Sequence, residues 1–150
     1  MRIHFREFII WNSLFIIALL VLSTEIFSFF NLINQYSIKI FWFIFLLFYI
    51  YFLKRNNFIK IIKEKFNLLN FESIFILTVL TLTFIIAIIY PPNTPDAMSY
   101  HMTRVMNWIQ NANINFYPTN DFRELIMGPL SSFLNLHLYL LVNGDYLTNL

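Results

Sequence analysis

Long apolar runs separated by short polar stretches dominate the first 90 residues of the chain. They cover residues 8–30, 37–53 and 73–90. At about 1.5 Å per helical residue, runs of this length reach most or all of the way across the roughly 30 Å hydrocarbon core of a bilayer. The sequence lacks the alternating pattern of membrane β-barrels. The pattern therefore predicts an all-α, polytopic integral membrane protein with three transmembrane helices in residues 1–90.

The basic residues predict how these helices are oriented. Half of the lysines and arginines lie in residues 54–72, between the second and third runs. Short loops rich in Lys and Arg stay in the cytoplasm, and the amphipathic pattern of this loop is typical of a helix lying on anionic lipid. The N-terminus, with Arg2 and Arg6, is predicted to be cytoplasmic as well. Residues 91–128 then form an extracytoplasmic loop of a plasma (inner) membrane protein.

The first run has an alternative interpretation as a cleavable signal peptide, because small residues near Val21 and Ser23 resemble a cleavage site. The run continues past them to residue 30, which favours a retained helix. Glu25, near its outer end, is interpreted as an acid that reaches the interface or pairs with another helix.

The polar stretch 91–128 begins with Pro91-Pro92, which end the third helix because proline lacks an amide donor. Thr94 suits an N-cap and Asp96 a first helical turn, so an amphipathic helix is predicted over about residues 95–110. Its apolar side is expected to carry Met98, Met102, Val105, Met106 and Ile109. Its polar side is expected to carry Asp96, Tyr100, Arg104, Asn107 and Asn111. Such a helix is expected to lie along the outer membrane surface.

The last segment, residues 129–150, is apolar again up to residue 142, although Asn135 and His137 interrupt it. It predicts a fourth transmembrane helix, followed by a turn at residues 143–145. The chain then stops within another apolar-leaning segment, so we expect it to be the truncated start of a longer protein.

Composition supports the membrane assignment and narrows the function classes. The chain is 59% hydrophobic and 12% charged, against about 45–50% and 25% in soluble proteins. A net charge of +2 with no basic face argues against nucleic acid as a partner. The lack of cysteine excludes disulfides, thiolate nucleophiles and Cys-ligated zinc.

The polar residues of the outer loop have ordinary structural explanations. The helix dipole stabilises an acid such as Asp96, and His101 or Arg104 can meet lipid phosphate or solvent. Tyr100 and Trp108 suit anchors at the headgroups.

A metal site can be drawn only from scattered residues, namely Asp96, His101, Asp121, Glu124 and His137. None of them has the spacing of a recognised metal motif, so no metal site is predicted. The cofactor stays unknown; a divalent cation has no clear ligand set.

A longer pattern begins at Pro95. It comprises PDAMSYHMTRVMNWIQNANINFYPT, followed by REL, GPL and LHLYLLVNGD. This order of residues resembles the beginning of the membrane-embedded GT-C glycosyltransferases, specifically the bacterial relatives of the dolichyl-phosphate-mannose protein mannosyltransferases. The resemblance covers roughly residues 90–150, whereas the preceding helices match only in hydrophobicity. Gly128-Pro129 and Ser132 stand where those relatives tend to carry a Pro-Pro pair and a glutamate.

Such enzymes take a sugar from a polyprenyl-phosphate donor. The resemblance implies that Asp96 is the catalytic base, accepting the proton of an acceptor hydroxyl while that oxygen attacks the anomeric carbon. In such a mechanism, Arg104 or His101 is expected to bind substrate by neutralising the leaving phosphate, since a guanidinium matches phosphate oxygens. Tyr100 and Trp108 are candidates for stacking on the sugar, as an alternative to anchoring at the headgroups.

Two functions therefore follow as expectations. The first is the N-terminal fragment of such a glycosyltransferase, whose partners are the lipid bilayer and the lipid-linked donor; family members are much longer, so the fragment alone is expected to be inactive. The second is a small non-catalytic polytopic membrane protein, either a helper subunit or a degenerate remnant. A transporter would require charged residues or broken helices within the membrane. Only Glu25, Asn135 and His137 give any indication of such features.

Overall fold

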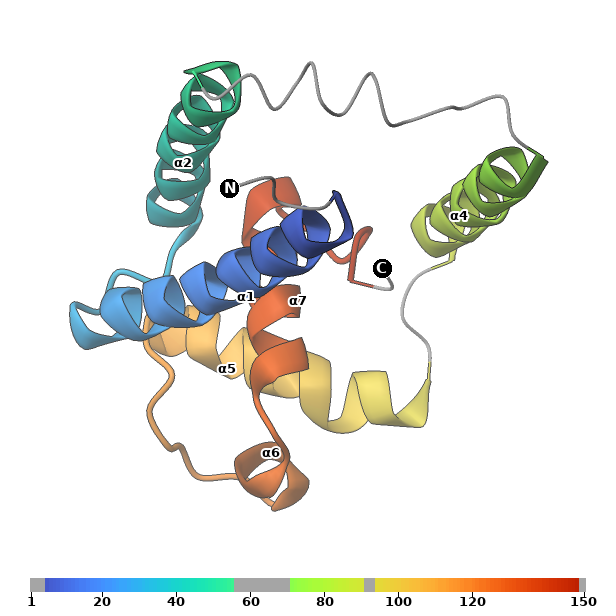
Figure 1. The fold of residues 1–150 in the computed structure, drawn as a ribbon. Helices are drawn as coiled ribbons and strands as arrows, with labels where there is room; N and C mark the ends of the chain where they lie inside the picture. The colour runs from blue at the N-terminus through green and yellow to red at the C-terminus, as the bar shows by residue number, and fades with distance from the viewer. Residues whose placement is uncertain (1–4, 56–70, 91–93, 149–150) are drawn as a thin grey trace.

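The computed structural model describes residues 5–55, 71–90 and 94–148, and within them every regular element is a helix (Figure 1). The order is α1 (Phe5–Phe29), α2 (Gln35–Arg55), α4 (Phe71–Ile89), the π-helical turn η1 (Ala97–His101), α5 (Met102–Asn111), α6 (Arg123–Ile126) and α7 (Leu130–Val142). The prediction of an all-α chain is confirmed for these residues. The predicted basic helix within 54–72 lies mostly outside them.

The three long helices coincide with the three apolar runs. They contain 25, 21 and 19 residues for α1, α2 and α4. By length and composition, α1 and α2 can cross a membrane. The third ends at Ile89, close before the predicted stop at Pro91-Pro92.

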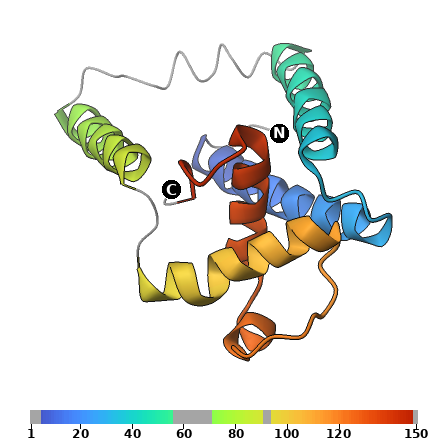
Figure 2. The same ribbon diagram turned by 180° about the vertical axis from the view of Figure 1, so that it is seen from behind.

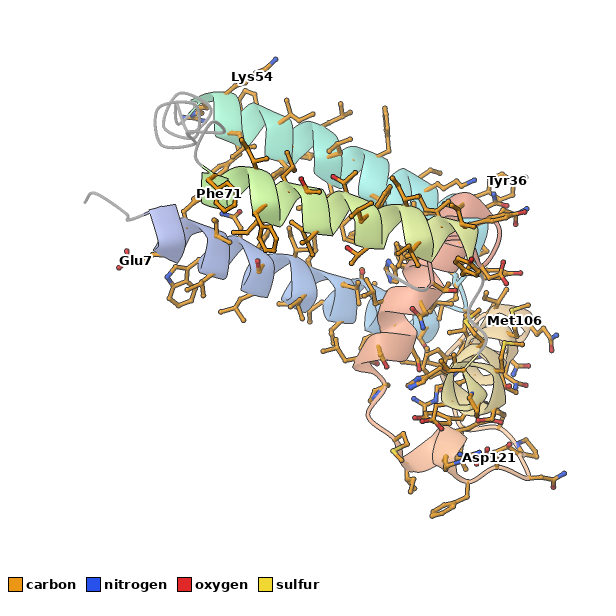
Figure 3. All side chains as sticks on the ribbon, turned by 90° about the vertical axis from the view of Figure 1, so that its right-hand side faces the viewer. Glu7, Tyr36, Lys54, Phe71, Met106 and Asp121 are labelled. Carbon is orange, nitrogen blue, oxygen red and sulfur yellow. The ribbon has the colours of Figure 1, made fainter. Side chains whose placement is uncertain are left out.

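The ends of these helices lie on two sides of the molecule. Glu7, Lys54 and Phe71, at the start of α1, the end of α2 and the start of α4, lie together at one end in Figure 3, whereas Met106 and Asp121 lie at the other. The chain therefore runs from one end of the molecule to the other in α1, returns in α2, and crosses again in α4. This arrangement separates the basic end of α2 from the polar stretch after α4.

α7 is shorter than the fourth transmembrane helix predicted over residues 129–150. α7 contains 13 residues, which rise only about 20 Å against a hydrocarbon core of roughly 30 Å. It ends at Val142, and its C-cap Asn143, whose φ of 57° lies in the left-handed region, stands at the start of the predicted turn. α7 packs on α1, α2 and α5, as Figure 1 and Figure 2 show from opposite sides. It is thus a short helix within the fold.

A small core forms where α7 meets α5, the end of α1 and the start of α2. Its buried apolar side chains are Leu20, Ile33, Ile38, Val105, Trp108, Phe133, Leu136 and Leu140. The backbone adds a link here, since the N–H of Ile33 donates to the carbonyl oxygen of Ala112 at 3.2 Å. The loop between α1 and α2 is thereby tied to the end of α5.

His137 joins α7 to both α1 and α2. The indole Nε1 of Trp42, which can only donate, lies 2.8 Å from His137 Nδ1. His137 therefore carries its proton on Nε2 and donates it to Thr24 Oγ1, 2.9 Å away. Thr24 in turn donates to the carbonyl oxygen of Leu20 at 2.8 Å. These bonds account for the presence of a histidine in an apolar helix.

Candidate functional site

The candidate site lies on the helical stretch that starts at Thr94. The Thr94 hydroxyl accepts a hydrogen bond from the Ala97 N–H at 3.2 Å, so the predicted N-cap is present. Residues 97–101 then form a π-helical turn, and the hydroxyl of Thr103, in α5, donates a hydrogen bond to the Met98 carbonyl oxygen at 3.0 Å. α5 continues to Asn111. The predicted helix over about 95–110 is therefore present, with a wider turn near its start, a feature frequent at functional sites.

The buried face of this helix differs from the predicted one. Tyr100, Arg104 and Trp108 are buried, whereas Met98 is 57% exposed. The prediction placed Tyr100 and Arg104 on an outward polar side and expected Tyr100 and Trp108 at the headgroups. It was wrong because α6 and α7 supply partners for these side chains, such as the Arg123 carbonyl oxygen and Ser132 for Arg104, that a helical pattern cannot show.

Asp96 is the most exposed of the predicted site residues. Its side chain is 69% exposed, and Oδ1 lies 3.6 Å from Nη1 of Arg123. Arg123 binds Asp121 more closely, with Nη2 2.6 Å from Oδ2 and Nε 2.9 Å from Oδ1. This pairing holds the pKa of Asp121 below its ordinary value. The carboxylate of Asp96 thus faces solvent beside the guanidinium of Arg123, which binds Asp121 more closely.

His101 sits within electrostatic reach of both Asp96 and Arg104. Its Nδ1 lies 3.1 Å from Ser132 Oγ and 3.4 Å from Ser131 Oγ. Burial, and after it the charge of Arg104, lowers the pKa of His101, while Asp96 acts in the opposite direction. His101 is therefore a neutral imidazole near pH 7.

The lowered pKa of His101 predicts a pH dependence of stability. In the unfolded chain this pKa is 6.5, so the unfolded state takes up a proton before the native state does. The contribution to stability is fully present above pH 6.5 and is lost as the pH falls through that value toward the native pKa. We expect the unfolding temperature in mild detergent, followed by circular dichroism, to fall more steeply below about pH 6.5 for the unmodified chain than for His101→Gln. Parallel curves for the two proteins would contradict this.

Arg104 is a buried cation with an exposed fraction of 1%. Its Nη2 donates to the carbonyl oxygen of Arg123 at 3.0 Å, and its Nη1 donates to Ser132 Oγ at 3.4 Å. The guanidinium lies 5.6 Å from the centre of the Trp108 ring. Its Nε is also buried and has no hydrogen-bond partner among the described residues. Three elements, α5, α6 and α7, therefore meet at this side chain.

Glu124, which the sequence indicated only as one of several scattered metal ligands, is the buried acid of this region. It is 5% exposed, and its Oε2 accepts a hydrogen bond from the Tyr117 hydroxyl at 2.5 Å. Burial and this bond raise the pKa of Tyr117. Burial lowers the pKa of Arg104, and the charges of Tyr117 and Glu124 oppose that effect. The sequence carries no local signal of this burial, since the apolar residues that follow Glu124 are themselves exposed.

A cavity of about 180 Å³ opens beside Arg104 and Glu124. Glu25 from α1 also lines it, together with the aromatic rings of Trp108 and Tyr117. Glu25, interpreted from the sequence as an interfacial or helix-paired acid, thus belongs to this region. Of the four predicted site residues, only Arg104 lines the cavity.

Tyr100 and His101 lie together on the part of the site nearer to Asp96. Their rings are 4.2 Å apart, and the Arg123 guanidinium lies 5.2 Å from the centre of the Tyr100 ring. Since Tyr100 is 8% exposed, it supports Arg123 rather than presenting an open face to a sugar.

The described residues contain no group of three or more His, Asp or Glu side chains that could hold a metal ion. His137, one of the scattered residues considered from the sequence, is bonded to Trp42 and Thr24. No protein-family model matches the chain, and no match is found among curated proteins or solved structures. The resemblance to GT-C glycosyltransferases therefore stays a prediction.

Proposed function

We propose that the chain is the N-terminal portion of an integral membrane glycosyltransferase that moves a sugar from a polyprenyl-phosphate donor to an acceptor hydroxyl on the extracytoplasmic side. The observation that carries this proposal is the grouping of a solvent-facing carboxylate, Asp96, with a neutral imidazole, His101, and a buried cation, Arg104, on one helical stretch. Transfer from a lipid phosphate needs a base for the acceptor hydroxyl and donors for the leaving phosphate.

Exposed apolar surface supports the placement in a membrane. Large side chains such as Trp11, Phe48 and Ile76 are exposed along α1, α2 and α4. Such surfaces are a liability in water and ordinary in lipid. α4, with 19 residues, rises about 28 Å and matches a third crossing. With the basic end of α2 in the cytoplasm, the candidate site faces outward.

In the proposed reaction, Asp96 accepts the proton of the acceptor hydroxyl as the hydroxyl oxygen bonds to the anomeric carbon. The bond from that carbon to the phosphate oxygen breaks in the same step, and its electron pair leaves with the lipid phosphate. The configuration at the anomeric carbon therefore inverts. Arg123, 3.6 Å away, orients the carboxylate of Asp96.

Arg104 and His101 are the proposed partners of the leaving phosphate. A phosphate oxygen would meet Arg104 from the cavity, where a guanidinium can offer two parallel hydrogen bonds. His101 would act as a neutral hydrogen-bond donor. Tyr100 would position Arg123, with which it makes a cation–π contact.

A non-catalytic polytopic membrane protein is the second candidate function. The observation that favours it is that several polar residues of the region satisfy one another, as Arg123 does with Asp121 and Tyr117 with Glu124. In that case the same contacts serve only to hold α6 against the loop that precedes it.

Transfer activity in membranes distinguishes these two candidates. The chain would be expressed alone and joined to the reading frame that follows it, and the membranes supplied with radiolabelled polyprenyl-phosphate-linked sugars. Transfer above that of membranes lacking the chain supports the enzyme. Background transfer by both forms, at verified expression, would overturn it in favour of the non-catalytic protein.

The outward position of the site gives a separate prediction. Because the chain has no cysteine, single introduced cysteines report their side of the membrane. We expect Ser99→Cys to react with a membrane-impermeant thiol reagent in intact cells, and Lys54→Cys to react only after the cells are opened. The reverse pattern would exclude the outward topology, and with it the use of a donor on that side.

A further inference from the structure

α1 and α2 form the walls of a groove of about 660 Å³, toward the end of the molecule where Glu7 and Lys54 lie in Figure 3. The walls are largely aromatic, with Phe8, Trp11, Phe15, Phe45, Phe48 and Phe52 among the lining residues. Two polar groups in the wall, Asn12 Oδ1 and the Tyr49 hydroxyl, are joined by a hydrogen bond of 3.0 Å. The groove therefore offers an apolar surface to an occupant.

The groove extends over about half the thickness of a bilayer. Along α2, from Phe45 to Arg55, the rise is about 15 Å, against a hydrocarbon core of roughly 30 Å. A spanning helix from another chain would need a contact face through both leaflets, whereas an acyl chain occupies one leaflet. The volume also lies within the roughly 300–1,000 Å³ of small-molecule sites.

Positive charge lies at the end of the groove. Arg55 lines it and forms, with Lys54, the basic last turn of α2. A guanidinium binds phosphate oxygens through paired hydrogen bonds, and a second cation nearby favours a headgroup with net negative charge over a zwitterionic one. The apolar wall and the basic end together match a single class of amphiphile.

We propose that this groove binds an acyl chain of an anionic phospholipid from the cytoplasmic leaflet, with the lipid phosphate at Lys54 and Arg55. The proposal rests on the membrane placement of α1 and α2 given above and is independent of sugar transfer. It assigns a lipid site at the opposite end of the molecule from Asp96.

Trp11, 68% exposed and in the groove wall, is a built-in reporter of the occupant. The full chain would be reconstituted in phosphatidylcholine vesicles containing increasing fractions of acyl-brominated phosphatidylglycerol or, in parallel, acyl-brominated phosphatidylcholine. Bromine quenches indole fluorescence on contact. We expect half-maximal quenching at a mole fraction at least about fivefold lower for the anionic lipid, because each basic residue at an anionic surface contributes about that factor. Trp11→Phe should remove this difference.

The variant Lys54→Gln/Arg55→Gln should lose the preference while phosphatidylcholine still quenches. Lys39→Gln, which removes a positive charge near the start of α2, should retain it. Equal quenching by both lipids, or a preference that survives in the double variant, would overturn the lipid site and leave the membrane placement intact. Quenching of Trp11 by aqueous iodide and by neither lipid would overturn the membrane placement as well. Protection from all three quenchers would show that protein fills the groove.

Discussion

Asp96→Asn is expected to lower the rate of sugar transfer by at least about 100-fold, because a positioned general base contributes about 10²–10⁴-fold. The amide retains the shape of the carboxylate and cannot accept the hydroxyl proton. The fold should not change, since Asp96 is 69% exposed and its contact with Arg123 is loose at 3.6 Å. The measurement is the initial rate of transfer from a radiolabelled polyprenyl-phosphate sugar in membranes, with the chain joined to any reading frame that follows it.

Asp145→Asn is the matched control, because it neutralises another acid in the turn after α7. It should leave both the rate and the amount of protein unchanged. Full activity of Asp96→Asn would exclude Asp96 as the base, whatever the activity of the control. Glu124 would then be the acid to test next, since it lines the cavity together with Arg104.

Arg104→Met is expected to destabilise the protein by about 2–3 kcal/mol, the largest effect on stability that we expect from a single charged residue here. Methionine retains much of the packing against Trp108 but leaves the carbonyl oxygen of Arg123 and the Ser132 hydroxyl without their donor. It also leaves Glu124 buried without a nearby cation. The measurement is the midpoint of thermal unfolding in mild detergent, followed by circular dichroism.

Arg123→Met is the comparison for this prediction. Its guanidinium is 41% exposed and binds Asp121, two residues away. An exposed ion pair contributes little to stability, so its midpoint should move much less than that of Arg104→Met. Arg104→Lys should fall between the two, since it keeps the charge and loses the two-point geometry. Equal losses for the two methionine variants would contradict a structural role specific to Arg104.

Local signals in the sequence predicted the helices. Apolar runs of sufficient length, a proline pair and a threonine cap act within a few residues, and α1, α2, α4 and the helix after Thr94 all lie where these signals predict. The membrane crossings themselves, and the side that each loop faces, stay predictions.

Contacts between distant parts of the chain determine the features that the sequence did not predict. Arg104 is buried because α6 and α7 bring the Arg123 carbonyl oxygen and Ser132 to it. α7 packs on α1 and α2, where His137 bonds to residues 95 and 113 positions earlier in the chain. No periodicity within one helix carries such information.

α7 has a consequence for how the protein is made. A chain leaves the ribosome from its N-terminus, and segments can fold as they emerge. The first two helices and α5 are therefore synthesised before Phe133 can reach Trp108 and before His137 can reach Trp42. A nascent chain stopped short of α7 would already possess its candidate membrane helices, yet Arg104 would lack Ser132 and the core would be open. Translation of α7 is thus the step at which residues 94–128 can acquire their final geometry.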